Sequence, residues 1–253
     1  MSDAAIPLTT CPNCGATLGD LFCPHCGQKN TPLDPSLREF LHEAVHEMAH
    51  VDGKFLTSVR LLLLKPGALS REQFEGRRAR YVPPIRLYLV LSVLCFAVLA
   101  FAPLRGPRFS CTTCPEETRA HVEQEMREAV GHWIPRAMFV LVPIFAGLVA
   151  VVARHSHRNY PQHLYFAMHV HAAWFLVGAV AALIGLALGP ARGSAVATVL
   201  GVWALLYLAI AFHRAYRSSV FRAVVAAVLV PFAYLIAIAV AMLTIIMPVA
   251  ARY

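Results

Sequence analysis

Charged side chains are scarce in this sequence, and acidic residues are absent after Glu128. Only 14% of the 253 residues are charged and 58% are apolar, whereas soluble domains have about 25% charged and about 45–50% apolar residues. The apolar residues gather in long blocks, which excludes an ordinary soluble globular protein and predicts several membrane spans. Because the later blocks contain no carboxylate, they lack the side chains that proton-coupled and sodium-coupled carriers commonly use.

The net charge of +8 comes from the second part of the chain. Residues 1–82 carry nine basic and nine acidic residues, whereas the rest carries 13 basic and five acidic residues. These arginines lie at the ends of apolar blocks, where they anchor helices and set topology. The charge therefore indicates membrane topology, and we expect no binding of nucleic acid.

Four of the seven cysteines form two C-x-x-C pairs, Cys11/Cys14 and Cys23/Cys26, each followed by a glycine. Two such turns supply the four soft ligands that tetrahedral Zn²⁺ requires. Two disulfides are the alternative, but residues 1–10 lack the features of a secretory signal, so we expect a reducing, cytosolic location. The spacing predicts a zinc ribbon over residues 1–32. Its metal is expected to be structural, with His25 on the surface.

Residues 33–82 are expected to form short cytosolic or interfacial amphipathic helices. The first contains two overlapping H-E-x-x-H matches, the zinc metalloprotease signature, formed by His42, Glu43, His46, Glu47 and His50. At about 100° per residue the three histidines form a stripe opposite the apolar face, so we favour a solvated face over a protease or an adventitious metal site. Further along, Lys65-Pro66-Gly67 predicts a helix end and Ser70-x-x-Gln73 predicts a capping box.

Residues 83–253 are expected to form a helical membrane domain. Five blocks approach or exceed the roughly 17–25 residues that a spanning helix needs, at about 84–102, 137–153, 165–188, 195–212 and 223–250. An odd number of spans places the termini on opposite sides. Arginines near span ends number ten on the N-terminal side and seven on the other. We therefore expect a cytosolic N-terminus, a C-terminus outside and an outside loop over residues 103–135.

The expected outside loop ends in a charged helical stretch, Glu116 to Val130, with an apolar edge formed by Val122, Met126, Ala129, Val130 and Trp133. Before this stretch lies a third C-x-x-C pair, Cys111 and Cys114. In an oxidising compartment such a pair can close to a disulfide that staples the loop, and we favour this interpretation. A redox or metal-sensing role is the alternative, although neither thiol has a neighbouring feature that would activate it.

Histidines cluster at the start of the third expected span, at positions 155, 157, 163, 169 and 171. Histidine is the only side chain in this region that titrates near neutral pH. Ionisable residues within spans are functional candidates, so His163, His169 and His171 are candidates for binding a metal or haem iron or for passing a proton. Solvation of the first three histidines at the membrane surface is the alternative, and it requires no site.

Three segments together resemble a known family. They are the ribbon with its closing Gly27-Gln28, the stretch from Asp52 to Tyr88, and the stretch from Asn159 to His171. In these segments the chain is similar to the bacterial domain of unknown function 3667 (DUF3667) family. The resemblance implies a bacterial multi-spanning membrane protein with a cytosolic zinc ribbon, and it implies no biochemical activity.

We therefore predict a mainly α protein with a four-cysteine zinc ribbon, short amphipathic helices and a bundle of about five spans. The favoured function is non-enzymatic: an inner-membrane protein whose cytosolic ribbon, with structural Zn²⁺, docks a protein partner or regulates the bundle. One alternative is a transporter or channel component with the third-span histidines in its path. The other is a membrane-embedded metal-binding or haem-binding protein or enzyme that uses them. No catalytic residue is assigned.

Overall fold

The computed structural model describes residues 9–19, 21–30, 36–37, 53–101, 116–188 and 190–250. Within these ranges the chain is mainly helical, and β-structure is limited to two isolated bridges. The predicted fold class is confirmed. The H-E-x-x-H matches of residues 42–50 and the Cys111/Cys114 pair lie outside the described residues.

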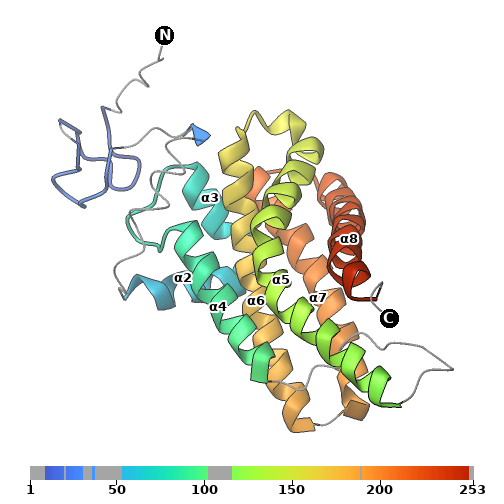
Figure 1. The fold of residues 1–253 in the computed structure, drawn as a ribbon. Coiled ribbons are helices and arrows are strands. Elements are labelled where there is room, and N and C mark those ends of the chain that lie inside the picture. Colours follow the sequence, from blue (N-terminus) through green and yellow to red (C-terminus); the bar gives the residue numbers. More distant parts are fainter. Residues whose placement is uncertain are drawn as a thin grey trace.

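Five long helices form the body of the molecule (Figure 1). They are α4 (Pro84–Phe101), α5 (Glu116–Val152), α6 (Tyr160–Leu188), α7 (Pro190–Tyr216) and α8 (Val220–Ala250). Each helix from α5 to α8 contains a stretch long and apolar enough to cross a bilayer, and α4 is a shorter apolar helix. Figure 1 shows that α5, α6, α7 and α8 run in alternating directions. This is the architecture of a multi-pass membrane protein.

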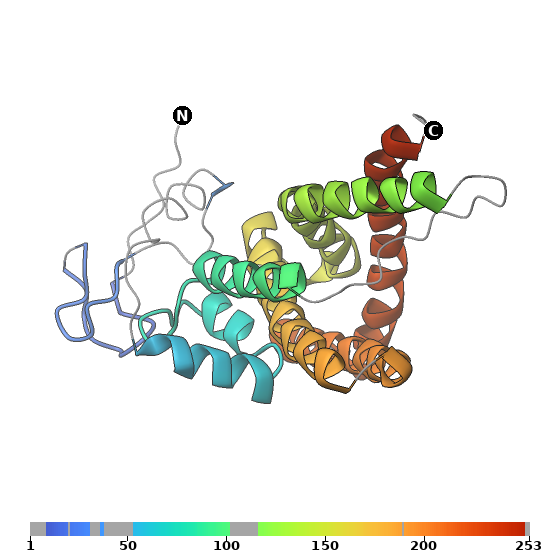
Figure 2. The same ribbon diagram turned by 60° about the horizontal axis from the view of Figure 1, so that its bottom comes forward.

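The helix α6 is the centre of the bundle. It packs against α4, α5 and α7 and also contacts the short helices α2 and α3. Figures 1 and 2 show α4 on one side of it and α7 on the other. Every residue from Pro161 to Ala173 is buried. A helix that is buried on all sides is expected to be apolar on every face. The histidines in this segment are exceptions to that expectation.

The helix α5 is longer than the span expected for it. The sequence predicts a helical stretch over residues 116–130 within an outside loop and a separate span from residue 137, whereas one continuous helix begins at Glu116. Val122 and Met126 in the added turns are buried, with Ile246 of α8 packed against them. At 1.5 Å per residue the 37-residue helix is about 55 Å long, which exceeds the roughly 30 Å hydrocarbon core. The charged segment therefore continues the helix beyond the membrane.

Two short helices, α2 (Lys54–Leu64) and α3 (Ala68–Phe74), precede the bundle. The predicted helix end at residues 65–67 is confirmed, because α2 ends at Leu64. The predicted capping box is wrong: Gly67, with φ +78°, occupies the N-cap of α3 and no side chain caps it. The chain turns at this left-handed glycine, so Ser70 falls inside the helix and is buried.

Candidate metal centre and its contacts with the bundle

Four cysteines from the two turns of the ribbon converge on one point. The Sγ atoms of Cys11, Cys14, Cys23 and Cys26 all lie within 4.8 Å of one another. Two of the pairs, Cys11–Cys26 and Cys14–Cys23, are 3.6 and 3.5 Å apart. These separations far exceed the roughly 2.05 Å of a disulfide bond, so the four thiols are free and two disulfides are excluded.

Both turns are built from the same backbone hydrogen bonds. In the first turn the Gly15 N–H donates to the Cys11 carbonyl and the Cys11 N–H donates to the Ala16 carbonyl, both at 2.8 Å. The second turn repeats this pattern around Cys23 and Gly27. The two glycines have φ values of +77° and +69°, a left-handed conformation that glycine adopts without strain. Each glycine therefore closes the turn that directs two thiols to the same point.

The donor set fits a tetrahedral Zn²⁺ ion. Zn–S bonds of about 2.3 Å place the sulfurs of such a site about 3.8 Å apart, close to the Cys11–Cys26 and Cys14–Cys23 separations. Burial acts to raise the pKa of the Cys26 thiol, but hydrogen bonds from the Gln28 backbone, from Asn13 and from neighbouring thiols lower it to about 6. Four thiolate ligands leave no position for water, so the metal would stabilise the two turns rather than activate a nucleophile.

Gln28 joins the ribbon to the loop between α3 and α4. Its Nε2 donates to the Gly76 carbonyl at 2.7 Å, and its Oε1 accepts from the backbone N–H groups of Arg78 and Ala79, both at 3.0 Å. One amide side chain thus satisfies three backbone groups from a distant part of the sequence. Because Gln28 lies two residues after Cys26, folding of the second turn sets the position of this amide.

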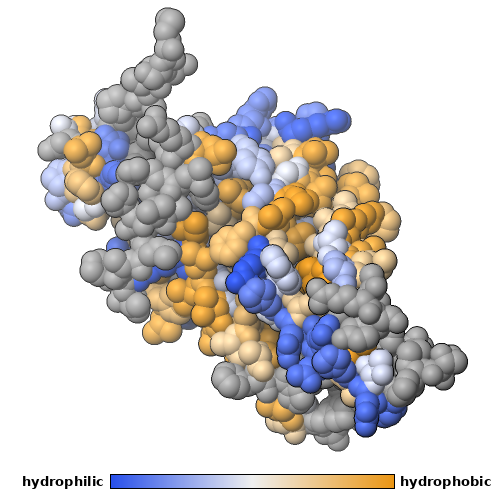
Figure 3. All heavy atoms as spheres, viewed as in Figure 1, coloured by the Kyte–Doolittle hydropathy of each residue, from blue (hydrophilic) through white to orange (hydrophobic). Residues whose placement is uncertain are grey.

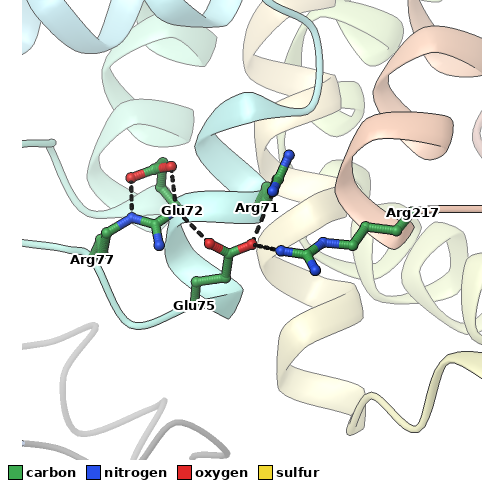
Figure 4. Close-up of polar contacts among 5 residues, drawn as sticks. All are labelled: Arg71, Glu72, Glu75, Arg77 and Arg217. Carbon is green, nitrogen blue, oxygen red and sulfur yellow. Dashed lines mark hydrogen bonds and ion pairs between the residues drawn. The ribbon is translucent and has the colours of Figure 1, made fainter. Parts of the chain in front are cut away.

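An ion-pair network extends from α3 to the turn between α7 and α8 (Figure 4). Glu75 pairs with Arg71 at 2.9 Å, with Arg217 at 2.7 Å and with Arg77, which also pairs with Glu72 at 2.6 Å. Partial burial acts to raise the pKa of the Glu75 carboxyl, but the three arginines lower it to about 2. Glu75 is therefore ionised at neutral pH and holds α3 to Arg217 after the end of α7.

The connection between α2 and α3 packs directly on α7. A Cβ atom at Gly67 would lie 2.2 Å from the carbonyl oxygen of Ala211, so a larger residue would push the two backbones apart. Arg214 donates to the carbonyl that precedes Gly67 at 2.6 Å, and the Tyr207 hydroxyl donates to the Leu62 carbonyl at 2.9 Å. The carbonyls in the last turn of a helix have no hydrogen-bond donor within that helix. Tyr207 of α7 supplies a donor to one such carbonyl of α2, that of Leu62.

The three candidate histidines of α6 each contact a different element. The hydrogen-bonded pairs are His163 with Tyr216 of α7 at 2.8 Å, His169 with Ser70 of α3 at 3.0 Å, and His171 with Tyr234 of α8 at 2.9 Å. All three imidazoles are buried. Within the described ranges, only the four cysteines form a group that could hold a metal. The histidines therefore make three separate contacts between helices.

His163 is buried, whereas the alternative interpretation places it at the membrane surface, in contact with water or headgroups. His155 and His157 are exposed, as that alternative requires, but His163 is only 3% exposed. The helix α6 begins at Tyr160, five residues before the expected span, and its first turn is already covered. The Tyr216 ring stacks on the imidazole with 5.6 Å between ring centroids, which removes it from water.

The hydrogen bonds of His171 determine its tautomer. Its Nδ1 lies 2.8 Å from the Ala167 carbonyl, which can only accept, so Nδ1 carries a proton. No acidic residue follows Glu128, so α6, α7 and α8 offer no counter-charge for an imidazolium. The ring is therefore neutral, and its Nε2 accepts from the Tyr234 hydroxyl. Both nitrogens are satisfied, as buried polar groups require.

Sequence reasoning identified the cysteines and histidines but not the residues that bind to them. The sequence predicts Ser70 as a helix cap and Arg217 as a topology signal at a span end, and it does not single out Tyr216, Tyr234 or Glu75. A polar residue within an apolar helix is a signal that a partner exists. That signal does not identify the partner, because the pairs are separated by 53 to 142 residues along the chain.

Comparison with known families supports the resemblance for one segment of the chain. The family described as "Protein of unknown function (DUF3667)" matches residues 52–96. This segment includes α2, α3, the loop bound by Gln28 and most of α4. No curated protein and no solved structure shows a significant match to the chain.

Proposed function

We propose that this protein is a membrane-anchored docking protein whose zinc ribbon binds a protein partner and transmits that binding to the helical bundle. The observation that carries the proposal is the set of three hydrogen bonds from Gln28 to the loop after α3. The Glu75–Arg217 ion pair and the Ser70–His169 hydrogen bond extend this connection to α7 and α6. A change in the ribbon therefore has a continuous path of polar contacts into the bundle.

The proposed cofactor is one structural Zn²⁺ ion held by Cys11, Cys14, Cys23 and Cys26. The matching separations of the sulfur atoms support this choice, as does the preference of thiolates for zinc over hard cations. The metal would stabilise a ribbon that has almost no apolar core of its own, since only the first cysteine of each pair is fully buried there.

The proposed location is the inner (cytoplasmic) membrane of a bacterium, with the ribbon in the cytosol and the C-terminus outside. Support comes from the arginines at the end of the bundle next to α3. Arg154 and Arg158 lie between α5 and α6, and Arg217 lies between α7 and α8. Arg158 stacks over the Phe74 ring of α3 at 4.9 Å. Arginines concentrate on the cytosolic side of membrane proteins, so the ribbon shares that side.

The proposed partner surface lies on the second turn of the ribbon. Leu21 and Phe22, just before Cys23, are 67% and 57% exposed. Large apolar side chains exposed on so small a unit are typical of a protein interaction site. Thr10 occupies the equivalent place before Cys11 in the first turn, since Thr10 and Phe22 form matching bridges with Thr17 and Lys29.

This equivalence supplies a matched pair of variants. Phe22→Asp and Thr10→Asp place the same charge at corresponding positions, and both should retain one zinc per chain. We expect proteins that co-purify with the wild-type chain and the Thr10→Asp variant to be lost from Phe22→Asp, as measured by quantitative mass spectrometry. Identical sets of co-purifying proteins for all three chains would contradict the proposal.

The transporter and the metal-binding or haem-binding alternatives both depend on the histidines of α6. His163, His169 and His171 are each engaged by a hydroxyl group of another element. To carry a proton or to bind an ion, each would have to release a contact that holds two elements together. These contacts favour a role of the histidines in joining α6 to α7, α3 and α8.

A further inference from the structure

The helix α2 has an apolar face that no other part of the described chain covers. Its inner face is fully packed, since Ser58 and Leu62 are 0% and 2% exposed. On the other side Leu56 and Leu64 are 75% and 68% exposed. The surface over α2 and α4, at the lower left of Figure 3, is largely hydrophobic. A surface of this kind requires either a partner or lipid.

The contacts of α2 and α3 locate this face relative to the membrane. The Leu62 carbonyl binds Tyr207, nine residues before the end of α7, and Ser70 binds His169, nine residues after the start of α6. The two bundle partners, Tyr207 and His169, lie within stretches long and apolar enough to cross a bilayer. At 1.5 Å per residue they are about 13 Å inside the ends of their helices. The C-terminal end of α2 thus lies beside an apolar stretch of α7 that is long enough to cross the membrane, and not beyond the end of that helix.

The charges around the face suit phospholipid. Lys54, Arg60 and Lys65 are exposed, and no acidic residue occurs between Lys54 and Arg71. Long basic side chains can lie along acyl chains while their charged ends reach headgroup phosphates. A helix face with exposed leucines, exposed basic side chains and no acidic residue is the pattern of helices that lie in the membrane interface.

We infer that α2 is an interfacial helix in the leaflet on the ribbon side of the membrane. Its Leu56 and Leu64 side chains contact acyl chains, and Lys54, Arg60 and Lys65 bind the phosphates of anionic phospholipids. This lipid contact is independent of partner docking by the ribbon, whose exposed residues Leu21 and Phe22 precede α2 in a different unit. The ribbon is therefore attached to a segment that is itself embedded in lipid.

The experiment places a photoreactive phenylalanine analogue at residue 56, or separately at residue 64, of the full-length protein. Each variant is reconstituted into vesicles of phosphatidylethanolamine and phosphatidylglycerol and irradiated, and adducts are identified by mass spectrometry. The matched control carries the analogue at Phe22, which is exposed to a similar degree on the ribbon.

We expect phospholipid adducts at residues 56 and 64 and none at residue 22. We also expect phosphatidylglycerol to be enriched among the adducts relative to its share of the vesicles, and this enrichment to fall at least twofold in Arg60→Gln. Crosslinks between two copies of the chain at residues 56 and 64, without lipid adducts, would overturn the inference. Equal lipid labelling at residue 22 would also overturn it, because the contact would then be nonspecific. Circular dichroism of each variant confirms its helical content, and two independent positions protect the test against failure of one variant to fold.

Discussion

At the scale of single residues, Gly67 shows how closely α2 and α3 approach the bundle. Its φ of +78° and the 2.2 Å separation between a Cβ at this position and the Ala211 oxygen are two independent penalties for any side chain. Alanine in the left-handed region alone costs about 1–2 kcal/mol, and the overlap with the backbone of α7 adds to this.

We therefore expect Gly67→Ala to lower the free energy of unfolding by at least about 1–2 kcal/mol. Chemical unfolding in detergent micelles, followed by circular dichroism, measures the change. Gly53→Ala is the control, because Gly53 has open space around its Cβ position and should change stability by less than about 0.5 kcal/mol. Equal stability of Gly67→Ala and wild type would show that α2 and α3 do not pack on α7 as described.

Tyr234 and His171 provide a second prediction at this scale. Tyr234→Phe removes the hydroxyl that donates to Nε2 and leaves a buried acceptor without its partner, at a cost of about 1 kcal/mol. A double-mutant cycle with His171→Phe should give a coupling energy of about 0.6 kcal/mol or more, the average for hydrogen bonds between membrane helices. Additive effects of the two substitutions would refute the contact between α6 and α8.

At the scale of elements, α3 connects the ribbon to the bundle. It begins after Gly67, which packs on α7, and its Ser70 contacts α6. Glu75, directly after its last residue, pairs with Arg217. Removing one of these contacts should loosen α3 without unfolding the five long helices, which pack on one another through a continuous apolar core.

The Glu75 network predicts a pH dependence. Its folded-state pKa of about 2 lies below the ordinary value of 4.5, so its contribution to stability is complete above pH 4.5 and is lost as the pH falls toward 2. At pH 7, Glu75→Gln should unfold about 2–4 °C below wild type if the network contributes about 1 kcal/mol. Thermal scans should show this gap closing between pH 4.5 and 2. The control Glu128→Gln, on the exposed part of α5, should follow wild type, and a gap for Glu75→Gln that stays constant to pH 2 would contradict the assignment.

The elements also show which features a sequence can predict. The cysteine turns and the apolar blocks are local patterns, so the four converging thiols and the helical membrane bundle were predictable. The helix over residues 116–130 was also predictable from its apolar edge. Its continuity with the following span was not, and neither was the contact of Val122 with Ile246, because that contact depends on how α5 packs against α8. Ser70 matched a capping pattern, but the left-handed turn at Gly67 decided where α3 begins. Pairs such as His169 with Ser70 depend on how α3 packs against α6, which no local pattern specifies.

At the scale of the whole molecule, a small four-cysteine unit is attached to a bundle with its own core. The ribbon buries few apolar side chains, whereas the largest buried side chains, such as Phe145, Phe166 and Phe212, belong to the bundle. The two parts should therefore differ in their response to loss of the metal.

We expect a chelator to release one zinc per chain and to make residues 9–30 sensitive to protease, with little change in far-ultraviolet circular dichroism. The bundle provides nearly all of the helix in the described residues, so its signal should persist. Metal analysis together with mass spectrometry of the proteolytic fragments checks this outcome. Loss of most of the helical signal on chelation would show that the bundle depends on the metal.

The central claim is that the ribbon controls the segment after α3 through Gln28. Hydrogen–deuterium exchange of the full-length protein in lipid nanodiscs tests it most directly, because the Arg78 and Ala79 N–H groups donate to the Gln28 side chain. We predict faster exchange at residues 76–82 both after zinc removal and in Gln28→Ala, with no such change in the neighbouring control Lys29→Ala. Exchange at residues 76–82 that is the same in the zinc-free protein, in Gln28→Ala and in the wild type would contradict the claim.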